Sequence, residues 1–107
     1  MIFRRIVITC IVLAASAETA AADAIDGSWC REGGAQLSID GPNIVTPEGH
    51  SIIGVYNRHF FSYIVPPGEQ QSGVTIQLRL LNEQTMQLRA VPEGAIQTWQ
   101  RCSPPTT

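Results

Sequence analysis

Hydrophobic and polar residues alternate along several short stretches of this chain. In residues 74–80, Val, Ile and Leu alternate with Thr, Gln and Arg, and residues 85–90 repeat the alternation. A period of two places the apolar side chains on one face of a β-strand. Asn82-Glu83-Gln84, between the two stretches, is typical of a tight hairpin loop. The pattern therefore predicts antiparallel strands with one face on a core and the other in water.

Further short strands are predicted between turns rich in glycine and proline. They cover residues 28–31, 35–39, 43–46 and 95–102, and no stretch after residue 22 keeps a helical period. Residues 51–65 are β-branched and aromatic on both faces, which predicts either one long bent strand or two strands meeting near Asn57-Arg58. The polar loop 66–73 that follows is the longest irregular stretch.

The first 22 residues have the pattern of a secretory signal peptide. Arg4 and Arg5 precede an apolar run over residues 6–15, and small residues follow it. Cleavage is expected after Ala22, with Ala17 as the alternative. The apolar run is too short to span a bilayer, which takes about 20 residues. We therefore expect export to the periplasm or the medium, a single β-domain over residues 23–102 without a membrane span, and a flexible tail over residues 103–107.

Charge and cysteine content narrow the partners and the environment. Without the first 22 residues the chain has five arginines, no lysine and eight acidic residues, a net charge of −3 with neutral histidines. Nucleic acid is not an expected partner, because it demands a basic patch. Cys30 and Cys102 remain after cleavage, and export predicts a disulfide between them. The bridge closes a loop of roughly 70 residues and contributes about 4 kcal/mol in the chain-entropy model.

Seven or eight short strands whose first and last members are joined predict a small antiparallel up-and-down barrel. A flattened two-sheet sandwich is the alternative. Asp26-Gly27-Ser28-Trp29 resembles the Gly-x-Trp that opens the first strand in lipocalins and related calycin barrels, here in a chain of about half their length. The resemblance implies that Trp29 packs across the closed end of the barrel. We expect Trp29 and Trp99 to be core residues that fill the barrel ends, with a ligand-contacting role as the alternative.

Residue patterns for catalysis or metal binding are lacking. His50 and His59 are the only histidines, and their spacing matches no metal motif. Ser51 and Ser72 lack the strained turn of an activated serine. The glutamates in Gly/Pro turns are expected to be solvated: Glu32, Glu69 and Glu93. We therefore expect no enzymatic activity, no metal and no cofactor.

Two segments are candidates for binding. Histidine and arginine among the aromatic residues of segment 56–63 fit a pocket for a small anionic or aromatic ligand. The alternative is a packed sheet face on which the Arg58 stem covers neighbouring rings. Loop 66–73 is the second candidate, because its prolines limit its freedom and lower the entropy cost of docking. The predicted contact residues are Tyr56, Arg58, His59, Tyr63, Glu69 and Ser72.

The sequence thus predicts a monomeric, exported, non-enzymatic binding module for a small ligand or an envelope protein. A structural component of the cell envelope is the alternative. The plan of a small disulfide-linked β-barrel is also similar to that of bacterial lysozyme inhibitors of the membrane-bound and periplasmic C-type group. That similarity implies a loop that presents a serine and a basic residue to an active site. Ser72-Gly73 is the nearest match, and the chain has no lysine to supply the basic residue.

Overall fold

A computed structural model describes residues 24–103, so the predicted signal peptide and residues 104–107 lie outside it. The described residues form nine β-strands and no helix, which confirms the all-β prediction. Consequently no helix in this range is long and apolar enough to cross a membrane. The strands are β1 (Gly27–Cys30), β2 (Gln36–Asp40), β3 (Asn43–Val45), β4 (Ser51–Ile53), β5 (Val55–Asn57), β6 (Phe60–Ile64), β7 (Thr75–Asn82), β8 (Thr85–Val91) and β9 (Gln97–Arg101).

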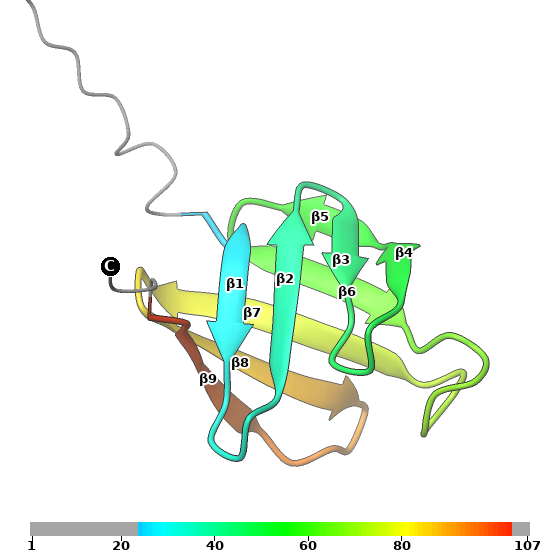
Figure 1. Ribbon diagram of the computed structural model, residues 1–107. Coiled ribbons are helices and arrows are strands. Elements are labelled where there is room, and N and C mark those ends of the chain that lie inside the picture. Colours follow the sequence, from blue (N-terminus) through cyan, green and yellow to red (C-terminus); the bar gives the residue numbers. More distant parts are fainter. Residues whose placement is uncertain (1–23, 104–107) are drawn as a thin grey trace, which may run out of the picture.

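The strands form one antiparallel sheet that curves into a nearly closed barrel (Figure 1). Their order is β4-β3-β2-β1-β9-β8-β7-β6-β5, so sequential strands other than β4 and β5 are neighbours and the first strand pairs with the last. The two strands that end this order, β4 and β5, are consecutive in the chain and separated only by Gly54. The up-and-down barrel is confirmed, and the sandwich alternative is not adopted.

The disulfide between Cys30 and Cys102 is present. Its S–S distance is 2.06 Å and the two Cα atoms lie 5.0 Å apart. It reinforces the place where β1 pairs with β9, next to the register pair of Cys30 with Gln100. A disulfide of this kind indicates an oxidising environment of the sort that exported proteins meet.

Residues 51–65 form three strands, where one or two were expected. The turn between β5 and β6 lies at the predicted place, near Asn57-Arg58. The additional break falls at Gly54, because a Cβ there would lie 2.4 Å from the carbonyl oxygen of Ser62 and 2.6 Å from the ring of Phe61. Only glycine lets the chain pass this close to β6. Before Gly54 the chain pairs with β3 as strand β4, and after Gly54 it pairs with β6 as strand β5.

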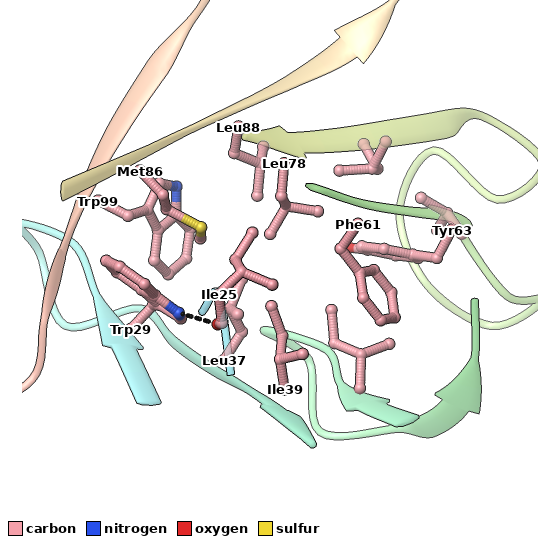
Figure 2. Close-up of a cluster of buried hydrophobic side chains, with 13 residues drawn as sticks. Ile25, Trp29, Leu37, Ile39, Phe61, Tyr63, Leu78, Met86, Leu88 and Trp99 are labelled. Carbon is pink, nitrogen blue, oxygen red and sulfur yellow. Dashed lines mark hydrogen bonds between the residues drawn. The ribbon is translucent and has the colours of Figure 1, made fainter. Parts of the chain in front are cut away.

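Buried side chains occupy the interior of the barrel (Figure 2). Trp29 and Trp99 are 0% and 2% exposed, which confirms that both are core residues. They lie together beside Met86, whereas Phe61 and Tyr63 lie in the opposite part of the core (Figure 2). The expectation that the tryptophans fill two different ends is therefore wrong. They come from β1 and β9, which are neighbours in the sheet.

One end of the barrel is covered by residues 24–26, just before β1. Ile25 is fully buried, and its N–H donates to the carbonyl of Arg58 at 2.6 Å. Its own carbonyl accepts a hydrogen bond from Trp29 Nε1 at 2.8 Å. We call this the closed end; the turns between β2 and β3 and between β5 and β6 lie there. Trp29 therefore packs at the closed end, as the calycin resemblance implied.

Candidate functional site

The six predicted contact residues do not form one site. Arg58 and His59 are exposed in the turn at the closed end, whereas Glu69 and Ser72 belong to loop 66–73 beyond the far end of β6. We call that far end the open end. Tyr63 is buried in the core, and Tyr56 on β5 is half-buried against it. Because the β5–β6 turn reverses the chain, Tyr56 lies opposite Phe61 and on the same inner side.

Tyr56 helps to hold the closed end. Its hydroxyl donates to Asp26 Oδ1, and Asp26 Oδ2 accepts the N–H of Gly41 at 2.7 Å. The hydrogen bond to Asp26, followed by burial, raises the pKa of Tyr56. His59 donates its backbone N–H to Asn57 Oδ1 at 2.8 Å, and its carbonyl accepts from Leu80 at 3.0 Å. These contacts all hold the turn between β5 and β6 or the segment 24–26 that covers the closed end.

Glu69 is buried, contrary to the expectation that turn glutamates are solvated. Only 8% of the residue is exposed, and Oε2 accepts hydrogen bonds from Thr46 Oγ1 at 2.5 Å and from His50 Nδ1 at 2.6 Å. A buried carboxylate requires such partners to offset its lost hydration. Glu48 Oε2 also accepts the backbone N–H of Gln70 at 3.2 Å. These bonds, which we call the open-end clamp, tie loop 66–73 to the turn between β3 and β4.

The clamp lacks the geometry of a hydrolytic triad. In such a triad the histidine stands between the acid and the hydroxyl nucleophile. Here the hydroxyl of Thr46 donates to Glu69 itself and accepts the backbone N–H of His50 at 3.1 Å. Within residues 24–103, no group of three or more His, Cys, Asp or Glu side chains is placed to hold a metal ion. The bonds of the clamp connect two loops that are distant in sequence.

Tyr63 lies in the core near the clamp. Burial raises the pKa of Tyr63 to about 12, and the negative charges of Glu69 and Glu48 add to the effect. A tyrosine with a raised pKa stays neutral across the physiological range. Its ring packs against Phe61, with centroids 6.4 Å apart.

A gap in the barrel wall separates β4 from the second half of β6; we call it the window. Within the described sheet β4 pairs only with β3, and β5 pairs only with β6. The window narrows at Gly54, where the chain passes close to β6. At the open end it is bridged by the clamp, which joins the loop after β6 to the turn before β4.

Backbone hydrogen-bonding groups face the window from both sides. Hydrogen-bonded residue pairs stand at both ends of the β3–β4 ladder, and they fix which of the pairs between them are hydrogen-bonded. Because bonded and non-bonded pairs alternate in an antiparallel ladder, the N–H and C=O groups of Ser51 and Ile53 point away from β3 and toward the window. By the same alternation in the β6–β7 ladder, the backbone N–H and C=O groups of Ile64 point toward the window. The window thus presents two strand edges.

The surroundings of the window are apolar. Its outer surface is a hollow of about 430 Å³ lined by Ile52, Ile53, Gly54, Val55, Ser62, Tyr63, Ile64 and Thr75, none of them charged. Three of these residues are among the most exposed large apolar residues in the described range: Ile53 at 74%, Val55 at 69% and Ile64 at 62%. Contiguous exposed apolar surface on a soluble domain marks an interaction site more often than scattered residues do.

Sequence reasoning missed the window, although a signal for it was present. Residues 51–65 carry apolar residues on both faces. A strand with one solvated face is expected to have polar residues on that face, so the outward-facing apolar residues were the signal. It also missed Thr46 and His50 as partners of Glu69. Their approach depends on how two loops, far apart in sequence, meet at one end of the barrel.

Comparison of the chain with models of protein families, with curated proteins and with solved structures found no match.

Proposed function

We propose that this protein is an exported, non-enzymatic protein-binding module that accepts an extended apolar segment of a partner at the window. It acts in the periplasm or after secretion, and it binds as a monomer. The observation that carries the proposal is the coincidence, at one place, of unpaired strand edges and exposed apolar side chains. A strand edge recognises an extended peptide through its main chain, and neighbouring side chains select the residues of that peptide.

The chemistry of the window favours an apolar segment. Since none of its lining residues is charged, it offers no ion-pair partner to a charged peptide. Ile53 and Ile64 stand outward on its two sides and supply apolar contacts to alternate side chains of an added strand. Proteins usually shield such edges with charge, proline or a covering loop. Here the edges are flanked by isoleucine and valine, as an edge that receives a partner requires.

A small ligand inside the barrel is less well supported. The interior that such a ligand needs is occupied by the buried cluster around Trp29, Phe61 and Leu78. A second candidate is inhibition of a lysozyme by loop 66–73. The clamp favours this candidate, because it fixes the loop while Ser72 stays exposed. A loop held in its bound conformation loses less entropy on docking.

Site-specific cross-linking in the exporting host tests the proposal. A photoreactive residue is placed at position 53 or 64 in the window, at position 72 in the loop, or at position 81, where Leu81 is 48% exposed elsewhere on the surface. We expect one partner to be captured from positions 53 and 64 but not from 81, and the attachment site to map to an extended apolar segment. Ile64→Ser should abolish capture from position 53, whereas Leu81→Ser should not.

Three results would contradict this proposal. Equal capture from positions 53 and 81 would show that the window has no specificity. Capture only from position 72 would favour the inhibitory loop. A cross-link to a second copy of the chain would replace the partner by a homodimer.

A further inference from the structure

A second surface, on the outer face of β6 to β8, carries two arginines without partners. Arg79 and Arg89 are exposed, and within residues 24–103 neither makes a hydrogen bond or an ion pair. Register pairs Arg79 with Gln87 and Arg89 with Gln77, so the two arginines are diagonal neighbours on adjacent strands. Diagonal positions of this kind lie about 7–8 Å apart. Two arginine side chains that start from positions this close can both reach one anion.

The strands around these arginines contain no acidic residue. The sequences of β6, β7, β8 and β9 include neither Asp nor Glu, although the whole chain has nine acidic residues and a net charge of −2. The positive charge is therefore local and is not neutralised within the sheet. Arginine forks bind carboxylates through two parallel hydrogen bonds, which makes them suitable for recognition of that group.

The two arginines line a hollow of about 310 Å³, which we call the cup. Its lining residues are Phe60, Gln77, Arg79, Gln87, Arg89 and Ile96. This volume is at the lower end for small-molecule sites and suits one compact group. The glutamine amides both donate and accept hydrogen bonds, as hydroxyl groups of a ligand require. Phe60 and Ile96 add apolar contact at the side.

We propose that the cup binds a carboxylated sugar, one uronic acid unit of an anionic glycan. The carboxylate lies between Arg79 and Arg89, the ring hydroxyls bond to the amides of Gln77 and Gln87, and the carbon–hydrogen face of the ring packs on Phe60. An acidic peptide would also satisfy the arginines, and its main chain would pair with the amides, but it offers no carbon–hydrogen face of a sugar ring to Phe60. This proposal is independent of the window, because the two surfaces share no lining residue.

Titration of the oxidised protein with a galacturonic acid trimer, followed by amide NMR shifts, tests the inference. The matched ligand control is the methyl ester of the same trimer, and a hexaglutamate peptide represents the acidic-peptide alternative. Shifts are expected at Gln77 and Gln87 with the trimer, and binding at least about tenfold weaker with the ester. Arg79→Gln and Arg89→Gln should each weaken trimer binding by about tenfold or more, since a charged hydrogen bond is lost.

Arg58→Gln is the matched protein control, because it removes one arginine outside the cup. It should leave trimer binding unchanged. The proposal would be overturned by absence of trimer binding at millimolar concentration, by equal binding of the ester, or by tighter binding of hexaglutamate. Equal weakening by Arg58→Gln would likewise overturn it, since binding would then follow net charge alone.

Discussion

The guanidinium carbon of Arg101 lies 4.2 Å from the centroid of the Trp29 indole ring. This contact joins the last strand to the first at the closed end, close to the disulfide. Arg101 also donates from Nη1 to the carbonyl of Asp26 at 2.5 Å and from Nη2 to that of Ala24 at 2.7 Å. One side chain thus stacks on the central tryptophan and holds the segment that covers it. Burial lowers the pKa of Arg101, as expected for a cation partly removed from water.

Replacement of this arginine should loosen the closed end. Arg101→Met keeps an apolar stem over Trp29 but removes the donors to the carbonyl groups of Ala24, Asp26 and Glu83, which leaves three carbonyl groups without their partner. We expect the free energy of unfolding to fall by about 1–3 kcal/mol. Chemical denaturation measures the loss, and amide hydrogen exchange of Ile25 and Asp26 should accelerate. Arg89→Met, at an exposed position, is the control; an equal loss in both variants would contradict the role of Arg101.

Removal of the disulfide should lower stability by a larger amount. Cys30 and Cys102 are 72 residues apart, so the bridge strongly restricts the unfolded chain. The double variant Cys30→Ser, Cys102→Ser should lose about 2–4 kcal/mol. The same loss should follow addition of a reductant to the native protein, while the reductant should leave the double variant unaffected. Unchanged thermal stability of the reduced protein would disprove the contribution.

The strands and the closure of the barrel were predictable from the chain because both follow from local signals. Alternation in segments 74–80 and 85–90 places Ile76, Leu78 and Met86 in the core, as the structure has them. The cysteines at the two ends of the domain predicted that β1 and β9 are neighbours. The break at Gly54 was not predictable, because it arises from the close approach of the chain to Phe61 and Ser62, which belong to a later strand.

The candidate sites were less accessible to sequence reasoning than the fold. Glu69 has the sequence surroundings of a solvated turn residue, and its burial results from contact with a different loop. Segment 56–63 has the composition of a pocket, yet the turn after Asn57 sends Tyr56 and Tyr63 inward and leaves His59 outside. Residue type indicated which side chains could take part in binding or catalysis. Only the arrangement of strands decided which of them meet.

Loss of the clamp should free loop 66–73. Glu69→Ala removes the acceptor for Thr46 and His50 and leaves a buried hydroxyl without its acceptor. We expect a loss of about 1–3 kcal/mol in unfolding free energy and faster proteolysis within the loop. Glu93→Ala, at an exposed turn glutamate, should change neither quantity. Cleavage of the loop at the native rate in Glu69→Ala would show that the clamp does not restrain it.

A side chain at position 54 should distort the barrel wall where the window narrows. The Cβ of Gly54→Ala would lie 2.4 Å from a backbone oxygen of Ser62, a distance that backbone atoms cannot relieve without a shift. We expect destabilisation by about 1–3 kcal/mol, within the range for overpacked sites. Chemical denaturation measures the loss. Unchanged stability of Gly54→Ala would contradict the close approach.

The neutral state of Tyr63 should make the fold sensitive to alkaline pH. Its pKa is raised to about 12 in the folded protein, against an ordinary value of about 10 in the unfolded chain. Because the folded state disfavours the tyrosinate, the stabilisation is fully present below pH 10 or so and is lost as the pH rises toward about 12. Absorbance of the tyrosinate and denaturation across this range measure both effects. In Tyr63→Phe the decline should be shallower, since Tyr56, whose pKa is also raised, is then the one tyrosine whose ionisation opposes folding. An unchanged slope in that variant would show that Tyr63 does not control the alkaline transition.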